Sequence, residues 1–248
     1  MLTIHDIRIE YLKEPLGVDI LKPRFSWKLE SDTHPIMQTA YQIFVHEANL
    51  SKSGHRLVWD SGKVQSELST HVEYDGETLR SNTAYVCQLR VWDTAGNESS
   101  WQKSTFETAF LNPASEWRAH WISGELPGTE GGCDYMRNVF QTEGRIVKAR
   151  LYATALGMYQ VWLNGQRIGD WQLTPGWTSY HTRLQYQTYD VTQHLNEGPN
   201  AIGGIIGDGW YKGNLTWGEL RNLYGDRRGI SLELPSRILL SKGFVTFV

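Results

Sequence analysis

Ten aromatic residues lie between Gly157 and Gly218 without any helical spacing. An indole or phenol ring offers a flat face for stacking and a hydrogen-bonding group at its edge. Rings of this kind, held on β-turns, suit the apolar face of a sugar ring. They are Trp162, Trp171, Trp177, Trp210, Trp217, Tyr159, Tyr180, Tyr186, Tyr189 and Tyr211. The alternative for each ring is that it packs into the core of a β-sandwich.

Short motifs of the commoner catalytic and cofactor sites are missing. The sequence contains no CxxC, HExxH, GxSxG or GxxxxGK[ST] pattern, and its eight histidines show no metal-ligand spacing. The glycines of GGIIGDG open no capped helix, which argues against a dinucleotide site. We therefore expect no cofactor and no metal, with calcium as the one alternative. Asn164, Asp170 and Asp208 offer the oxygen ligands that Ca²⁺ prefers, although turn formation explains them equally well.

Sugar hydrolysis requires two carboxyl groups about 5 to 9.5 Å apart. Asp208 and Glu219 flank the aromatic GWY segment and are the best candidates among 27 acidic residues. The alternative is that both are solvated or form turns. We favour that alternative and expect no catalytic residue.

Length and composition favour two all-β domains. A chain of 248 residues can bury a sizeable core without a metal or disulfide. Its 24 glycines, 12% aromatic residues and 4 methionines are typical of strands joined by turns. The net charge is −3 and no block of Lys or Arg occurs, so we expect no nucleic-acid partner. Cys87 and Cys133 fall in different predicted domains, which excludes a disulfide framework.

The N-terminus predicts a cytoplasmic protein. MLTIHDIRIEY lacks the apolar run of a signal peptide, and no run of about 18 apolar residues occurs anywhere, so we expect no membrane partner. A mature chain whose signal had been removed would read similarly.

Residues 1–111 predict a sandwich of the fibronectin type III or immunoglobulin kind. Seven strand-like runs recur with turn signals between them: IRIEYL, RFSWKL, YQIFVHEA, LVWDSGKV, HVEYDGETL, AYVCQLRVWD and STFETAF. Leu79 stands six residues before Tyr85, as in a tyrosine corner, and Cys87 follows. Trp27 occupies the strand in which an antibody domain carries its other cysteine, so the type III variety fits better.

Residues 115–248 predict a second, jelly-roll-like sandwich after a break at Asn112 to Ser115. Asn164 and Gly165 between VWL and QRI indicate a type I′ hairpin. YDVTQHLNEG predicts one helical turn capped by Asp190 or Thr192, and NAIGGIIGDGWY predicts a return to strand. Pro235 is expected to interrupt the final run, and we expect the sandwich to be truncated at its C-terminal end.

The run WLNGQRIGDWQLTPGWTSYHTRLQYQTYDVTQHL, followed by GDGWYKG and LYGDRR, resembles the N-terminal domain of bacterial α-L-rhamnosidases. The domain ending in EWRAHWI resembles the module that precedes it in that family. The resemblance implies a larger glycoside hydrolase, whose helical (α/α)6 barrel carries the catalytic carboxylates. Twelve helices of about 11 to 12 residues would fill more than half of this chain, which offers one helical turn. We therefore expect this chain alone to be inactive.

The sequence thus predicts a non-catalytic β portion of an α-L-rhamnosidase, which recognises L-rhamnose or rhamnosides and docks on the catalytic barrel. The predicted sugar-binding residues are Trp177, Tyr180, Trp210, Tyr211 and Trp217 for stacking, with Asp170, Arg183 and Asp208 for hydrogen bonds to ring hydroxyls. One alternative is a scaffold without a sugar site. Another is an autonomous glycosidase that uses Asp208 and Glu219.

Overall fold

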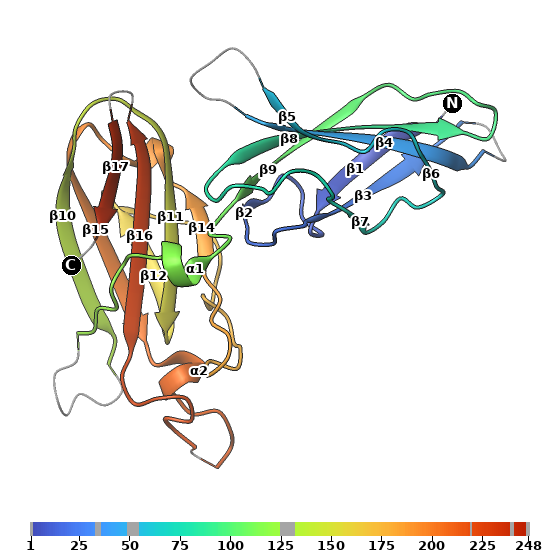
Figure 1. Ribbon diagram of the computed structural model, residues 1–248. Coiled ribbons are helices and arrows are strands. Elements are labelled where there is room, and N and C mark those ends of the chain that lie inside the picture. Colours follow the sequence, from blue (N-terminus) through green and yellow to red (C-terminus); the bar gives the residue numbers. More distant parts are fainter. Residues whose placement is uncertain are drawn as a thin grey trace. The chain divides into compact units, whose positions relative to one another are not determined.

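The computed structural model describes residues 2–32, 36–48, 55–124, 132–218, 220–238 and 241–246, without the side chains of 236–238 and 241–246. Figure 1 traces the chain. It divides into two compact units, Met1–Glu116 and Trp117–Val248. Strands dominate both units, and the described helical segments are single turns. The prediction of an all-β fold with two sandwiches is confirmed.

The first unit packs two sheets around one core. The smaller sheet has the order β1–β3–β7, and the larger has the order β2–β9–β8–β4–β5, with β6 also paired to β4. Its strands are β1 (Thr3–Ile9), β2 (Leu16–Val18), β3 (Arg24–Glu30), β4 (Gln38–Glu47), β5 (Arg56–Asp60), β6 (Val64–Gln65), β7 (Val72–Glu73), β8 (Ala84–Asp93) and β9 (Gln102–Thr108). Phe25 and Trp27 of β3 face Ile43 of β4 and Leu89 of β8 in the core.

The predicted tyrosine corner is present. The hydroxyl of Tyr85 accepts a hydrogen bond from the backbone N–H of Arg80 at 2.8 Å, and the Tyr85 ring stacks on Phe106 with 5.1 Å between centroids. The bond satisfies a backbone donor in the connection that leads into β8. The predicted strand F therefore corresponds to β8, and Cys87 within it is buried.

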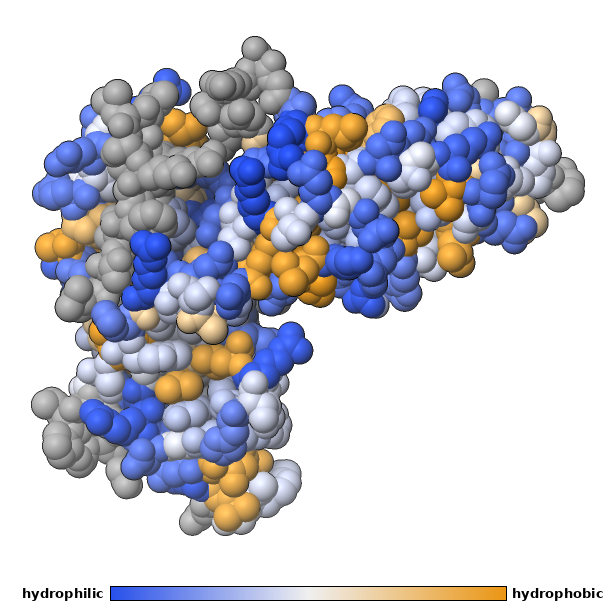
Figure 2. All heavy atoms as spheres, in the orientation of Figure 1, coloured by the Kyte–Doolittle hydropathy of each residue, from blue (hydrophilic) through white to orange (hydrophobic). Residues whose placement is uncertain are grey.

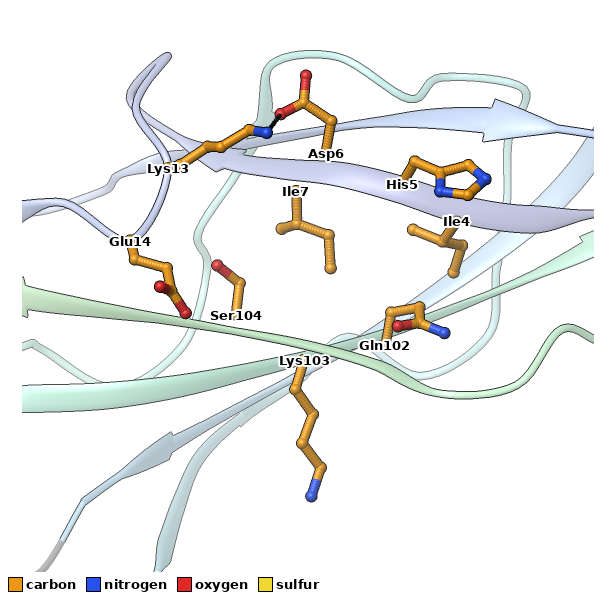
Figure 3. Close-up of a pocket in the computed structure, with 9 residues that line it drawn as sticks. All are labelled: Ile4, His5, Asp6, Ile7, Lys13, Glu14, Gln102, Lys103 and Ser104. Atoms are coloured by element: carbon orange, nitrogen blue, oxygen red, sulfur yellow. Dashed lines mark ion pairs between the residues drawn. The ribbon is translucent and has the colours of Figure 1, made fainter.

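A shallow hollow of about 220 Å³ lies between β1 and β9 of the first unit (Figure 3). Asp6 at its rim pairs with Lys13 at 2.9 Å, and Arg8 and Lys28 lie at 3.0 and 3.1 Å from the same carboxylate. The hydrogen bonds from Lys13 and Arg8 hold the pKa of Asp6 below its usual range. Three basic side chains therefore surround the one carboxylate of Asp6 at this rim.

The second unit is also a pair of sheets (Figure 1). One has the order β10–β15–β12–β13 and the other β14–β11–β16–β17. The strands are β10 (Asp134–Thr142), β11 (Ile146–Leu156), β12 (Met158–Leu163), β13 (Gln166–Arg167), β14 (Gln187–Asp190), β15 (Gly198–Gly207), β16 (Gly229–Ile238) and β17 (Ser241–Thr246). Leu151 of β11 and Leu232 of β16 meet Val161 of β12 and Ile206 of β15 in the core.

The predicted hairpin between β12 and β13 is confirmed. Leu163 pairs with Gln166 across a two-residue turn. Asn164 and Gly165 have φ values of 51° and 82°, and a type I′ turn requires positive φ at both central residues.

The helical turns differ from the predictions. The break at Pro113 is a short helix, α1 (Pro113–Glu116), because the N–H groups of Ser115 and Glu116 bond to the carbonyl of Asn112. The turn at Thr192–His194 (η1) is a 3₁₀ helix with Val191 at its N-cap and no side-chain cap bond there. The predicted cap residues bond to each other instead: Asp190 Oδ1 accepts from Thr192 N and Oγ1.

The segment NAIGGIIGDGWY returns to strand as predicted, but the strand ends before its last residues. β15 stops at Gly207, and Gly209–Lys212 forms a helical turn, α2. Gly209 has a φ of 52°, which turns the chain out of the sheet, and a Cβ there would meet Met158 at 2.6 Å. Trp210 and Tyr211 therefore project from a turn beyond the sheet and not from a strand.

Pro235 does not interrupt the last run, contrary to expectation. It lies inside β16 and pairs with Phe244 of β17. The ladder to β11 keeps one register on both sides of it, with Ala149 opposite Ser236 and Tyr152 opposite Glu233. The missing N–H of proline thus affects the ladder locally without shifting the strand. In the described part of the chain, no helix has the length and apolar character needed to cross a bilayer.

Candidate functional site

Aromatic residues gather where three loop segments of the second unit meet, beyond the end of β15. The segments are residues 169–183, α2, and residues 220–228. The indoles of Trp177 and Trp210 lie nearly parallel, with 6.1 Å between centroids and 6° between planes. Trp177 keeps 55% of its surface exposed, so this stack faces solvent.

Three further rings and an imidazole continue the cluster. Tyr180 meets Tyr211 edge-on at 5.3 Å and Tyr224 at 5.0 Å, and His181 lies 5.4 Å from Tyr224. Trp177 Nε1 donates to the Tyr224 hydroxyl at 3.3 Å, which ties the stack to the tyrosines. We call these six residues, Trp177, Tyr180, His181, Trp210, Tyr211 and Tyr224, the aromatic cluster.

Tyr180 is the half-buried centre of the cluster. Its hydroxyl donates to the carbonyl of Gly176 at 3.0 Å, and burial raises the pKa of the phenol. The tyrosine is therefore a neutral hydrogen-bonding group at ordinary pH. A neutral, partly apolar surface of this kind matches a sugar better than it matches an ionic ligand.

The structure brings together four of the five predicted stacking rings and leaves the fifth apart. Trp217 is fully exposed and has no ring contact within the part of the chain described. Tyr224 and His181 were not predicted, although the quoted motifs LYGDRR and TSYHTR contain them. Nothing in the spacing of those motifs shows that residues 181 and 224 meet, since loops of different lengths separate them.

Asp208 is held by two arginines. Its Oδ2 accepts from Arg221 at 2.6 Å, and its Oδ1 accepts from Arg228 at 3.1 Å. The Arg228 side chain is 1% exposed and also donates to Asp134 of β10 at 2.9 Å and to the carbonyl of Gly132. This buried ion network fixes the residue that precedes α2, and thereby positions Trp210 and Tyr211.

The other two predicted polar residues lie on exposed loop positions. Arg183 closes the turn that follows Trp177: its N–H bonds to the Ser179 carbonyl at 2.9 Å, and its carbonyl accepts from Thr178 Oγ1. Asp170 is exposed and follows Gly169, whose missing side chain lets the chain pass against the ring of Tyr189. Both side chains are accessible to a ligand.

Two of the candidate rings, Tyr159 and Tyr189, belong to the core. Tyr159 is 4% exposed, and its hydroxyl lies 3.2 Å from that of Tyr189 and bonds to the carbonyl of Ala153. Burial, followed by the neighbouring Tyr189, raises the pKa of Tyr159 well above the usual range. These phenols join the two sheets from inside and are not available to a ligand.

The alternative calcium ligands do not lie together. Asn164 Oδ1 accepts from the N–H of Ala201 near the start of β15, whereas Asp208 follows the end of that strand. Ala201 and Asp208 are seven residues apart along this strand. At about 3.3 Å per residue, Asn164 and Asp208 are therefore more than about 20 Å apart. The described residues contain no group of three His, Cys, Asp or Glu side chains that could hold a metal. Glu219, the other candidate carboxylate, lies outside the described residues.

Comparison with known sequence families gives a match for each unit. Residues 4–112 match the family described as Rha78A-like, N-terminal immunoglobulin domain. Residues 144–242 match the α-L-rhamnosidase N-terminal domain.

The curated relatives that match this chain are named α-L-rhamnosidases. An α-L-rhamnosidase of Formosa agariphila is 36% identical over 84% of this chain and 23% of its own length. One from Alteromonas sp. is 35% identical over 82% of this chain and 23% of its own length. The chain therefore spans about a quarter of the length of the curated relatives it matches.

Solved structures of α-L-rhamnosidases also match this chain. The crystal structure of native α-L-rhamnosidase from Aspergillus terreus matches 100% of this chain with 29% of its own, at a TM-score of 0.88 and 31% identity. The Streptomyces avermitilis α-L-rhamnosidase complexed with L-rhamnose matches 99% of this chain with 40% of its own, at a TM-score of 0.90 and 24% identity. At that identity, the second match supports the fold alone.

Proposed function

The chain belongs to the α-L-rhamnosidase family through its two N-terminal domains, and from this membership we propose that its second unit recognises rhamnosyl sugars and docks on a helical catalytic barrel. The aromatic cluster is the observation that carries the proposal. It presents the solvent-facing stack of Trp177 on Trp210 beside phenol hydroxyls, which is the combination that a sugar ring requires.

Polar side chains at the edge of the cluster would bind the ring hydroxyls. Asp208 already accepts from Arg221 and Arg228, but a carboxylate has about four lone-pair sites, so it retains capacity for a hydroxyl. Arg183 and Asp170 would contribute from the loop that also carries Trp177. The role of Tyr224 and His181 is to hold the rings in place.

Binding should be weak, because free sugars are small and strongly hydrated. Two stacking contacts of about 0.5 to 1.5 kcal/mol each and a few net hydrogen bonds of about 1 kcal/mol leave about −4 kcal/mol after association costs. That corresponds to a Kd of about 1 mM. Titration with L-rhamnose, followed by NMR or tryptophan fluorescence, tests the proposal directly. Absence of binding at tens of millimolar would favour the alternative of a scaffold without a sugar site.

The end of the second unit that carries the aromatic cluster would also dock on the barrel. Figure 2 shows hydrophobic residues gathered over the loop that follows α2. Trp217, Leu220 and Leu223 are 106%, 55% and 54% exposed, and clustered exposed apolar residues commonly mark an interface. Co-elution of this chain with a separately produced rhamnosidase barrel tests docking. A double variant with Leu220→Ser and Leu223→Ser should lose it, and a variant that still co-elutes would contradict it.

Catalysis is assigned to the barrel and not to this chain. Both oxygens of Asp208 accept hydrogen bonds from guanidinium groups, which gives this carboxylate a structural role beside α2. Purified chain should not hydrolyse an aryl rhamnoside. Turnover that disappears in Asp208→Asn would instead support the autonomous glycosidase. A cytoplasmic, bacterial setting stays a prediction from the sequence.

A further inference from the structure

The outward face of the β10–β15–β12–β13 sheet contains a trough. Side chains alternate across a strand, and the inward residues Tyr159, Val161 and Leu163 of β12 are buried in the core. Trp162 therefore points outward. Across the sheet it stands in register with Gly203 of β15, and Gly203 stands in register with Arg137 of β10.

Small residues form the floor and larger ones form the walls. Ala201 and Gly203 occupy outward positions on the central strand, while Val139 and Arg137 flank them on β10. Neighbouring strands lie about 4.8 Å apart, so the walls on β10 and β12 are about 10 Å apart. A hollow of about 300 Å³ occupies one end of the trough, lined by Arg137, Val139, Gln141, Asn164, Pro199 and Ala201.

Nothing in the fold itself requires a glycine at position 203. It pairs in regular register on both sides, and a Cβ there would meet only the Met136 carbonyl, at 3.7 Å. Its neighbour Gly204 differs, because a Cβ there would press on Ile230 in the core at 3.3 Å. Glycine inside a regular strand weakens the strand and often marks close approach by a ligand. Open space above Gly203 is what such a ligand would need.

Hydrogen bonds hold the end of the trough that contains the hollow. Asn164 Nδ2 donates to Asn200 Oδ1 at 2.7 Å, and Asn164 Oδ1 accepts from the N–H of Ala201 at 2.8 Å. Asn200 Nδ2 in turn donates to Thr142 Oγ1 at 3.1 Å. The hollow therefore exists before a ligand arrives, which reduces the ordering cost of binding.

The charged side chains on the outward face of this sheet indicate which class of ligand would bind there. The outward positions of the four strands carry two cations, Arg137 and Arg167, and no Asp or Glu. Arg137 is exposed and makes no ion pair within the part of the chain that the structure describes. A guanidinium fork binds a carboxylate through two parallel hydrogen bonds, and the indole of Trp162 offers a stacking face on the opposite wall.

We propose that this trough binds an acidic saccharide, with the carboxylate of a uronic acid residue on Arg137 and the adjoining sugar ring over Gly203 against Trp162. The site lies on the sheet and not on the loops of the aromatic cluster, so the inference does not rest on the proposed function. A saccharide of two rings, about 10 Å long, would reach from the hollow to Trp162.

Titration of the chain with digalacturonic acid by calorimetry and NMR, beside its methyl ester as the neutral control, tests the proposal. We expect a Kd of about 1 mM for the acid and at least about tenfold weaker binding of the ester. Amide signals of residues 137, 201 and 203 should shift. Excess L-rhamnose should not displace the acid, which separates this site from the aromatic cluster.

Two variants locate the site independently. Gly203→Val places a β-branched side chain on the floor without a backbone clash and should abolish binding. Arg137→Gln should reduce affinity at least about tenfold, while Lys103→Gln, which removes one exposed positive charge from the first unit, should leave it unchanged. The proposal is overturned by no binding at about 50 mM, by equal affinity for acid and ester, or by full affinity in folded Gly203→Val.

Discussion

The indole rings of Trp177 and Trp210 lie parallel, 6.1 Å apart at their centroids, although one belongs to a loop and the other to the turn after β15. Trp210 is placed by its helical turn, and that turn follows Asp208, which two arginines hold. Trp177 is placed by the hydrogen bond from its indole to Tyr224. The stack thus depends on three loop segments at once, and each of them can be perturbed separately.

Removal of either stacked ring should weaken rhamnose binding. We expect Trp177→Ala and Trp210→Ala each to cost about 0.5 to 1.5 kcal/mol of binding free energy, or about two- to twelvefold in Kd. Trp101→Ala is the matched control, because it removes a tryptophan from a stacked pair in the first unit. Unchanged rhamnose affinity in both cluster variants, with the fold intact by circular dichroism, would assign these rings to docking.

Arg228 should carry much of the stability of the second unit. Its substitution by Met leaves Asp134 and Asp208 as partly buried carboxylates without their shared partner. We expect a loss of about 3 kcal/mol in the free energy of unfolding, measured by urea denaturation. Arg145→Met, at an exposed position of the same unit, should change it by less than about 0.5 kcal/mol. A similar effect of both variants would mean that the buried network is not stabilising.

The tyrosine corner should stabilise the first unit through one hydrogen bond. Tyr85→Phe removes the acceptor for the N–H of Arg80 while it keeps the stacked ring. We expect a loss of about 1 to 2 kcal/mol of unfolding free energy, because a backbone donor loses its partner. Tyr41→Phe is the control, since the hydroxyl of Tyr41 makes no hydrogen bond to another described residue. Equal effects of the two variants would contradict a specific role of the corner.

Acid should weaken the first unit through Glu10. Hydrogen bonds from Arg24, at 2.6 and 3.0 Å to the side chain, lower the pKa of Glu10 below its ordinary value of 4.5. A carboxyl whose pKa is lower in the folded state stabilises the fold above the unfolded-state pKa and loses this effect as the pH falls through the folded-state pKa. The unfolding free energy should therefore fall below about pH 4.5.

Glu10→Gln isolates this contribution. At pH 7 the variant should lose about 1 kcal/mol, since the pair is partly exposed, and its stability should depend less on acid pH than that of the parent chain. Glu67→Gln, at an exposed position, should keep the pH dependence of the parent. Unfolding curves measured between pH 3 and 7 would contradict the assignment if Glu10→Gln and the parent chain lost stability in parallel.

The sequence by itself determined the features that depend on neighbours in the chain. Alternating β-branched and aromatic residues predicted the strands, and Asn164 with Gly165 predicted the hairpin, because a turn is decided by the φ values its own residues tolerate. The spacing of Leu79 and Tyr85 predicted the corner for a similar reason. Local rules failed at Gly209 and Pro235, where the sheet and its partners decided whether the strand ended or continued.

Tertiary structure alone decided which distant residues meet. It sent Tyr159 into the core and Trp177 to the surface, although both are aromatic residues of one glycine-rich stretch. It also set Arg137, Gly203 and Trp162 in one row, which no spacing in the sequence reveals. The physical reason is register: a shift of one residue between two strands moves every side chain to the opposite face, so the trough exists only once the pairing of three separate strands is fixed.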